Sequence, residues 1–201
     1  MTSGVLVTGT DDGVDTAIVS AALVASRPGA VHVRPVRTGS ADHDAVVAAL
    51  TGHDTVWGTT LEVALPPGPA ARHAGVRLER PHLLAPFRGV ELAVGEGAGG
   101  LLVELGTDGT TLADLATDLE LPLVLATRAV PSAINHTRLT LEASWARGLR
   151  VLGLVVTGYP SDPDLSAATT MAELERMAPV MATVPLLDRP LVAADLPRIE
   201  W

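Results

Sequence analysis

Short apolar runs alternate with amphipathic segments along most of the chain, and this alternation predicts strands interleaved with helices. Strands are predicted at Val5–Gly9, Val31–Val36, Leu92–Gly95, Leu121–Thr127, Val151–Val156 and Met181–Val184. Helices are predicted at Val14–Ala25, Asp42–Leu50, Thr111–Asp118, Ala133–Arg147 and Leu165–Met177, with a loop and a short helix over Val63–Gly75. Since strands that alternate with helices form βαβ units, we expect an α/β fold: a mostly parallel sheet with helices on both faces.

The chain is expected to form one domain over residues 1–201, with residues 188–201 as a loose C-terminal tail. The pattern contains no internal repeat and no linker. Glycine-rich or polar segments follow several predicted strands. Because the carboxyl ends of parallel strands meet at one edge of the sheet, we expect these segments to converge there and form the ligand site.

Composition narrows the function classes. An apolar fraction of 47% indicates a globular protein, and a net charge of −9 argues against nucleic-acid and anionic-membrane partners. The absence of cysteine excludes disulfides and thiolate metal sites. The chain has no apolar run of about 18 residues, so no transmembrane helix is expected. It also lacks a basic leader, and we therefore expect a cytoplasmic protein.

The basic side chains are all arginines, 14 in number, and the chain contains no lysine. A high-GC genome accounts for such a bias. Any chemistry that needs a lysine ammonium group is nevertheless absent.

The segment VTGTDDGVDTA, residues 7–17, begins like a phosphate-binding loop. Gly9 and Gly13 follow a strand and precede a helix, an arrangement that points backbone N–H groups at an anion. Asp15, Thr16 and Ala17, however, stand where such a loop has Gly, Lys and Thr. A carboxylate about 4 Å from a phosphate charge costs roughly 4 kcal/mol at an effective dielectric of ~20.

Two interpretations of Asp15 remain open. Its carboxylate either lies in the first helical turn, where the helix dipole favours it, or occupies the anion hole itself. The same segment also fits the TGxxxGV turn of short-chain dehydrogenases. That chemistry needs a Tyr–Lys pair, and the chain has Tyr159 but no lysine.

Six segments in order carry a resemblance to the dethiobiotin synthetase family over roughly residues 4 to 187. They are VTGTDDGV, VRPVRTG (33–39), EGAGGLLVEL (96–105), TLADLA (111–116), INHTRLTLEA (134–143) and ARGLRVLGLVV (146–156). The resemblance implies a P-loop NTPase-like fold and a homodimer. It also implies ATP- and Mg²⁺-dependent conversion of 7,8-diaminononanoate and CO₂ or bicarbonate into dethiobiotin. The segment Gly75–Leu92 is shorter than in the family, which suggests a trimmed helix.

The resemblance also implies site residues. Those implied for the nucleotide are Gly9, Thr10, Gly13, Val14, Asp15, Thr16, Glu96, Gly97, Ala98, Gly99, Thr157, Val184, Pro185 and Leu186. Those implied for the substrate are Thr38, Asn135 and His136, and those for Mg²⁺ are Glu96 with Asp44 or, alternatively, Asp42. Arg34 replaces the family's catalytic lysine, and Arg37 is expected to reach the same pocket. Thr157 stands where many relatives place a base-reading asparagine.

Two functions remain open at this stage. One is a dethiobiotin synthetase with a reshaped phosphate site, slowed on the order of 10²–10³-fold by the missing cation. The other is a non-catalytic dimeric homologue that binds or senses a ligand. A ligase that uses another nucleotide or an acyl phosphate is a weaker third interpretation.

Overall fold

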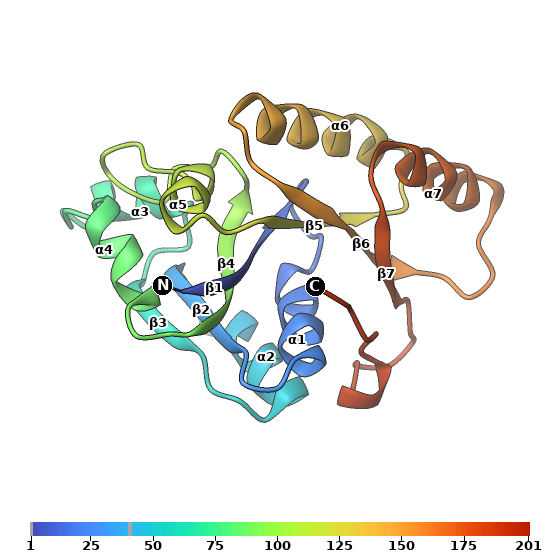
Figure 1. The fold of residues 1–201 in the computed structure, drawn as a ribbon, viewed down its shortest axis with the longest axis horizontal. Helices are drawn as coiled ribbons and strands as arrows, with labels where there is room; N and C mark the ends of the chain where they lie inside the picture. The colour runs from blue at the N-terminus through green and yellow to red at the C-terminus, as the bar shows by residue number, and fades with distance from the viewer. Residues whose placement is uncertain (1, 40–41) are drawn as a thin grey trace.

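The computed structural model describes residues 2–39 and 42–201, and for residues 42–44 it describes the backbone alone. Seven strands in the described part form one sheet in the order β3-β2-β4-β1-β5-β6-β7, and every neighbouring pair is parallel (Figure 1). The strands are β1 (Ser3–Gly9), β2 (Val31–Thr38), β3 (Val56–Leu61), β4 (Leu92–Gly100), β5 (Leu123–Arg128), β6 (Val151–Tyr159) and β7 (Val180–Pro185).

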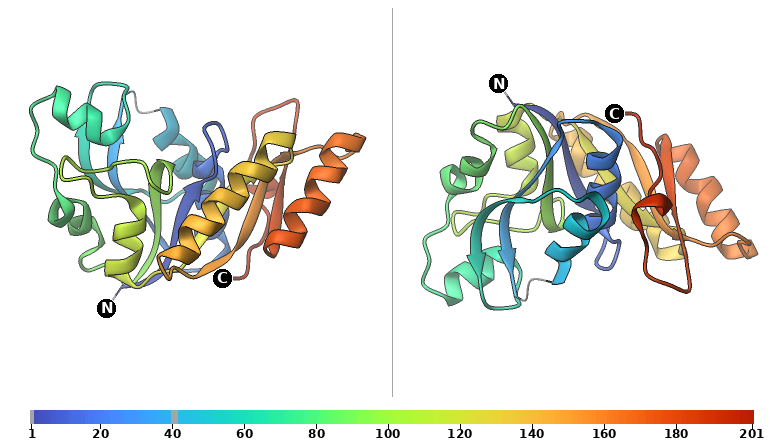
Figure 2. Two further views of the ribbon diagram at one scale, coloured as in Figure 1. Left: turned by 90° about the horizontal axis from the view of Figure 1, so that it is seen from above. Right: turned by 90° about the horizontal axis from the view of Figure 1, so that it is seen from below.

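Helices cover both faces of the sheet, as expected (Figure 2). They are α1 (Thr16–Ser26), α2 (Asp42–Thr51), α3 (Pro67–His73), α4 (Arg80–Leu84), α5 (Leu112–Leu119), α6 (Pro131–Ala146) and α7 (Leu165–Met177), with 3₁₀ turns at Ala85–Phe87 and Ala193–Asp195. Helices α1 and α2 pack together on one face, and α3 to α7 lie on the other. No helix of the described chain combines the length and the apolar character that crossing a membrane requires.

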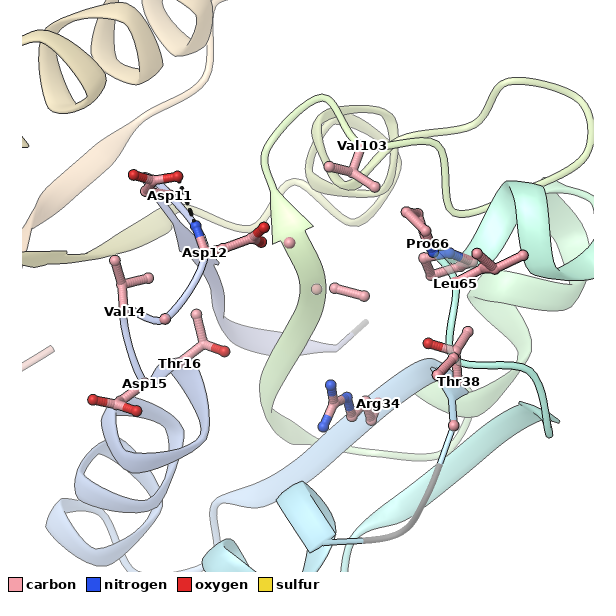
Figure 3. Close-up of a pocket in the computed structure, with 17 residues that line it drawn as sticks. Asp11, Asp12, Val14, Asp15, Thr16, Arg34, Thr38, Leu65, Pro66 and Val103 are labelled. Atoms are coloured by element: carbon pink, nitrogen blue, oxygen red, sulfur yellow. Dashed lines mark hydrogen bonds between the residues drawn. The ribbon is translucent and has the colours of Figure 1, made fainter. Parts of the chain in front are cut away.

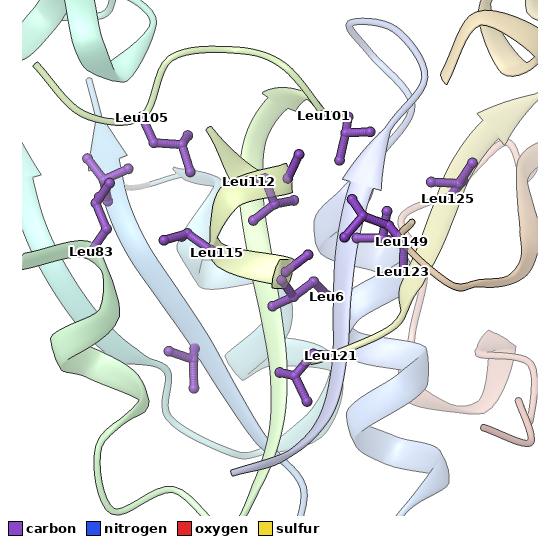
Figure 4. Packing of buried hydrophobic residues seen from close by; sticks show 14 of the residues in the cluster. Leu6, Leu83, Leu101, Leu105, Leu112, Leu115, Leu121, Leu123, Leu125 and Leu149 are labelled. Atoms are coloured by element: carbon purple, nitrogen blue, oxygen red, sulfur yellow. The ribbon is translucent and has the colours of Figure 1, made fainter. Parts of the chain in front are cut away.

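The α5 face holds the larger apolar cluster, in which buried leucines of the sheet and of α5 interlock (Figure 4). Leu6 of β1 and Leu112 of α5 are both essentially inaccessible to solvent. Their packing explains the glycines that flank Glu96 in β4. A Cβ on Gly95 would lie 2.4 Å from Leu6, and one on Gly97 would lie 2.8 Å from Leu112. Because successive residues of a strand face opposite sides, the side chain of Glu96, between the two glycines, lies on the α1 face.

Most predicted elements are present, with two omissions and one extension. Strand β4 continues through the glycine-rich segment to Gly100, beyond the predicted end at Gly95. Strand β3 was missed because VWGTTL is an edge strand without a clear apolar alternation. Helix α4 was missed because its five residues are too few for a periodic signal.

Strand β1 lies between β4 and β5, where the direction of strand addition reverses. A crevice forms outside the carboxyl ends of the strands at such a reversal. The segments after β1, β2 and β4 meet there, as the sequence predicted.

The C-terminal segment differs from the expected loose tail. Ile199 is 3% exposed, and its backbone N–H donates to Ser26 Oγ. It packs with a second, smaller apolar cluster on the α1 face of the sheet. The Trp201 indole N–H donates to the carbonyl of Leu23, and the Arg27 guanidinium lies 4.8 Å from the centre of the Trp201 ring. These apolar residues were spaced too irregularly to predict a regular element, yet they cover the C-terminal end of α1.

Replacing Ile199 with Ala is expected to lower the free energy of unfolding by about 2 kcal/mol, since it removes a buried side chain. Val192→Ala is the matched control in the same segment, because Val192 is 51% exposed. Urea unfolding followed by circular dichroism measures both. Equal and negligible effects of the two variants would show that the segment is loose after all.

Candidate functional site

A cleft of about 750 Å³ opens at the carboxyl edge of the sheet beside β1 (Figure 3). Its walls are the loop after β1, the end of β2, the segment before α3 and the glycines of β4. The lining residues are Asp11, Asp12, Gly13, Val14, Asp15, Thr16, Arg34, Thr38, Gly39, Ala64, Leu65, Pro66, Pro67, Gly97, Ala98, Gly99 and Val103. The cleft therefore brings together segments from three of the motifs that the sequence singled out.

The loop of residues 9–16, called the phosphate loop below, is tightly wrapped. A Cβ on Gly9 would lie 2.7 Å from Val14 and 3.0 Å from the carbonyl oxygen of Asp11, so only glycine fits there. The backbone N–H of Thr10 donates to the carbonyl of Ala126. The buried hydroxyl of Thr157 donates to the carbonyl of Val14 at 3.2 Å. The wrapped backbone of a phosphate-binding loop is thus present without the usual lysine.

Asp15 precedes α1 in a left-handed conformation, with φ 49° and ψ 49°. Its side chain is exposed and makes no capping hydrogen bond to the start of the helix. The carboxylate therefore does not cap the start of α1, and Asp15 lies before the first helical turn rather than in it. Asp11, Asp12 and Asp15 are exposed residues of the loop. The carboxylate of Asp12 points into the cleft, whereas that of Asp15 points away from it and Asp11 Oδ2 lies 2.9 Å from His136 (Figure 3).

Glu96 lies below the phosphate loop and is 1% exposed. Its Oε1 accepts a hydrogen bond from Thr16 Oγ1 at 3.0 Å, and Arg34 Nη1 lies 3.7 Å from the same oxygen. Its Oε2 is 3.0 Å from Nε2 of His32. The carboxylate therefore joins the first turn of α1 to strand β2.

Burial on its own would raise the pKa of the Glu96 carboxyl group. The hydrogen bond to His32 and the charge of Arg34 act in the opposite direction and lower this pKa from 4.5 to about 2. Glu96 is consequently ionised in the folded protein across the physiological pH range.

Sequence reasoning missed His32, which is 1% exposed and is the second residue of β2. Its Nδ1 lies 2.8 Å from the hydroxyl of Thr55, so the imidazole bridges Thr55 and Glu96. One signal was available in the sequence. His32 and Arg34 are two residues apart in a predicted strand, a spacing that places both side chains on one face.

Two predicted residues of β2, Arg34 and Thr38, line the cleft. Arg37, which was expected to reach the same pocket, is not among the lining residues. Its Nε donates to Thr60 Oγ1 at 3.1 Å, and its guanidinium lies 5.2 Å from the centre of the Trp57 ring. Strand alternation explains the difference, because residues 34 and 37 project from opposite faces of β2.

The predicted residues on β7, after β7 and on α6 lie outside this cleft. Val184 is buried in the second apolar cluster, whereas Leu186 is 60% exposed, and Pro185 ends β7 between them. Asn135 is exposed on α6. One helical position further on, His136 Nδ1 lies 2.9 Å from Asp11 Oδ2, at a second hollow of about 150 Å³ between α6 and the phosphate loop.

The side chains present do not fit Mg²⁺ at Glu96. Magnesium requires accessible oxygen ligands at about 2.0–2.1 Å and retains several waters. Both oxygens of Glu96 already have partners, and a guanidinium lies 3.7 Å away. Among the described side chains, no group of three or more His, Asp and Glu residues is arranged to hold a metal ion. The side chains of Asp42 and Asp44 lie outside the described residues.

The sheet order and the helices on both faces define an α/β fold like that of P-loop NTPases. Solved structures with this fold include a putative plasmid partition protein of Borrelia burgdorferi bound to AMPPNP, with TM-score 0.57, 10% identity and coverage of 93% of this chain and 88% of that one. They also include the septum site-determining protein MinD of Pyrococcus horikoshii complexed with Mg-ADP, with TM-score 0.54, 16% identity and coverage of 93% and 82%.

Sequence comparison identifies the family. A family model described as an AAA domain matches residues 3–191. The ATP-dependent dethiobiotin synthetase BioD of Mycobacterium avium is 38% identical over 97% of this chain and 92% of its own length. The Mycobacterium tuberculosis protein of the same name is 38% identical over 94% of this chain and 90% of its own length. The chain belongs to the dethiobiotin synthetase family.

Replacing Asp15 with Gly is expected to raise the free energy of unfolding by ~1 kcal/mol, because the left-handed conformation is strained for a residue with a Cβ. Asp15→Ala keeps the Cβ, removes the charge and should give no gain. Thermal and urea unfolding measure both variants. An equal gain from Ala would identify charge repulsion in the loop, rather than backbone strain, as the cost.

The folded-state pKa of Glu96 predicts a specific pH dependence of stability. Because this pKa is depressed, the contribution of Glu96 is fully present above pH 4.5 and is lost as the pH falls toward about 2. The wild-type protein should therefore lose on the order of 3 kcal/mol more unfolding free energy over this range than Glu96→Gln. Urea titrations at a series of pH values measure the difference. Glu104→Gln, which keeps Glu96, is the control, and parallel pH profiles for the wild type and Glu96→Gln would contradict the prediction.

Proposed function

We propose that this chain catalyses ATP-dependent closure of 7,8-diaminononanoate and CO₂ to dethiobiotin, at a rate about 10²–10³-fold below that of a site with the lysine. The observation that carries the proposal is the cleft, which combines the phosphate loop, Arg34 and the glycines of β4 at the switch point of the sheet. Identity of 38% over 97% of the chain to a dethiobiotin synthetase supports it.

The reaction requires charge stabilisation more than acid–base chemistry. One substrate amine adds to CO₂ and forms a carbamate, which attacks the γ-phosphorus of ATP and releases ADP. The second amine then attacks the carbonyl carbon of the mixed anhydride, so that the C–O bond to phosphate breaks and the cyclic urea forms. Each phosphoryl step gathers negative charge that the protein must offset.

The roles proposed for the residues follow from their positions. The phosphate loop offers backbone N–H groups to the phosphates from Gly13 to Thr16, since the N–H groups of Thr10 and Asp12 already donate to Ala126 and to Asp11 Oδ1. Arg34 is the cation that lines the cleft and takes the place of the family's lysine. Its guanidinium is larger and more weakly hydrated than an ammonium, so it positions an anion less closely. Thr38 contributes a hydroxyl from the opposite wall of the cleft.

A homodimer and a cytoplasmic location form part of the same proposal. Leu139 and Trp145 of α6 are 56% and 55% exposed, on the helix that also carries Asn135. These exposed apolar side chains support contact with a second copy, which would place Asn135 near a substrate shared between the copies. Sedimentation analysis over a range of concentrations tests the dimer. Dependence of the reaction on ATP supports the cytoplasmic location.

A second candidate is a non-catalytic homologue that binds the diamine. The observation in its favour is the negative wall of the cleft, where the carboxylate of Asp12 points inward from a loop that also carries the exposed Asp11 and Asp15 (Figure 3). Such a wall attracts a dication and repels a triphosphate. Calorimetry with ATP·Mg²⁺ and with diaminononanoate, each alone, separates the two candidates. Nucleotide binding tighter than ~100 μM contradicts a site that has lost its nucleotide.

Phosphate release is expected only when ATP, the diamine and bicarbonate are all present. Release without the diamine would indicate an unrelated ATPase, and no release under any condition would leave the non-catalytic homologue as the answer. Detection of dethiobiotin by mass spectrometry identifies the product directly.

Restoring the family residues is expected to tighten ATP binding at least tenfold, since a lysine supplies charge-assisted hydrogen bonds to phosphate. The variant is Asp15→Gly/Thr16→Lys/Ala17→Thr, and calorimetry measures its affinity. Ala17 is 5% exposed and packs against Val47 of α2, so Asp15→Gly/Thr16→Lys without the third change is the companion variant. Unchanged affinity in both variants would show that other parts of the nucleotide site have also diverged.

A further inference from the structure

The buried side chains around Glu96 form a connected group, and the proposed reaction assigns no role to two of its members, His32 and Glu96. His32 and Glu96 are each 1% exposed, and Arg34 is 14% exposed. The group spans β2, β4 and the start of α1, and it extends through His32 to Thr55 before β3. Four separate segments of the chain are therefore tied together through one carboxylate.

The hydrogen-bond directions within this group are fixed by chemistry. An ionised carboxylate can only accept, so His32 Nε2 carries a hydrogen and donates to Oε2, and the Thr16 hydroxyl donates to Oε1. Removing any one partner would leave buried polar atoms without a match.

The carboxylate of Glu96 has both a nearby cation and hydrogen-bond donors. Burying an unpaired carboxylate costs several kcal/mol, and this cost is offset when a cation and hydrogen-bond donors lie close to it. Arg34 supplies the cation at 3.7 Å, and His32 and Thr16 supply donors at 3.0 Å each. A divalent cation would have to displace at least one of these partners and would meet the charge of Arg34.

The position of Thr16 gives the group its structural role. Thr16 is the first residue of α1 and directly follows the strained Asp15. Its bond to Glu96 is the contact through which the last residue of the phosphate loop is attached to the sheet. The hydrogen bond between Thr16 and Glu96 thus attaches the loop to strand β4.

We propose that Glu96 is an internal anion that anchors the phosphate loop in this chain, and that it is not a metal ligand. Thr16 and His32 are positioning residues that hold its two oxygens. This inference concerns the protein before any reaction and does not rest on the proposed function.

The first test compares Mn²⁺ binding to the wild type and to Glu96→Gln by electron paramagnetic resonance, with Mn²⁺ alone and with Mn²⁺·ADP. Equal affinities within twofold, or no measurable binding of Mn²⁺ by either protein, support the proposal. Weakening of the binding of Mn²⁺ alone by tenfold or more in Glu96→Gln overturns it, because loss of a loop anchor would weaken the Mn²⁺·ADP complex and not the free metal.

The second test measures stability without metal. Glu96→Gln should lower the folded-to-unfolded ratio by about tenfold or more, since it removes a hydrogen-bonded buried charge. If Glu96 were a metal ligand without protein partners, Glu96→Gln would leave this ratio unchanged or raise it in the absence of metal. That result overturns the proposal. If Glu96→Gln fails to fold, Thr16→Val keeps the carboxylate and deletes one donor, with Thr16→Ser as the variant that restores the hydroxyl. A stability loss in Thr16→Val that Thr16→Ser rescues supports the anchor, and no loss overturns it.

The third test observes the imidazole directly in protein labelled with ¹⁵N-histidine. Nuclear magnetic resonance should show His32 with its hydrogen on Nε2, and the signal should not move when excess MgCl₂ is added. The same signal should shift in Thr16→Val, because Glu96 loses a partner there. Movement of the His32 signal on addition of Mg²⁺ to the wild type would show that the metal reaches Glu96, and would overturn the proposal.

Discussion

A buried carboxylate must be matched by cations and donors wherever it lies in a protein, and Glu96 imposes this requirement on the centre of the fold. Gly95 and Gly97 beside it leave room for Leu6 and Leu112 on the α5 face of the sheet. The side chain of Glu96 lies on the opposite face, toward α1. His32 and Arg34 of β2 approach from one side, and Thr16 of α1 from the other. The sheet order, with β4 between β2 and β1, brings these segments together. The shape of the phosphate loop therefore depends on a charge that is satisfied within the protein.

This requirement also alters what the family's motifs mean in this chain. The chain belongs to the dethiobiotin synthetase family, and its EGAGG segment and wrapped loop lie side by side at the cleft. The side chains at the same positions now bond to one another. A hydroxyl from Thr16 occupies one oxygen of Glu96, and the cation nearest that oxygen is Arg34. A motif that matches in sequence can thus retain its fold while its polar groups take different partners.

The sequence predicted the α/β class, the parallel sheet and the convergence of the polar segments at one edge, because apolar periodicity and strand–helix alternation report on burial. It did not predict β3, since the pairing of an edge strand depends on its neighbour rather than on its own pattern. The packing of Ile199 against α1 was missed because the contact joins residues far apart in the chain. Within the site, Arg34 and Thr38 were identified, whereas His32 gained importance only when the fold placed it beside Glu96.

The roles of internal anion and metal ligand predict different partners for Glu96 when nucleotide and metal are present. A crystal structure of the wild-type protein with a non-hydrolysable ATP analogue and Mg²⁺ would show which partner Glu96 keeps. We expect the Thr16 and His32 hydrogen bonds to Glu96 to persist, with no metal near the carboxylate. A Mg²⁺ ion coordinated by Glu96 at about 2.1 Å, with Thr16 turned away, would contradict the account.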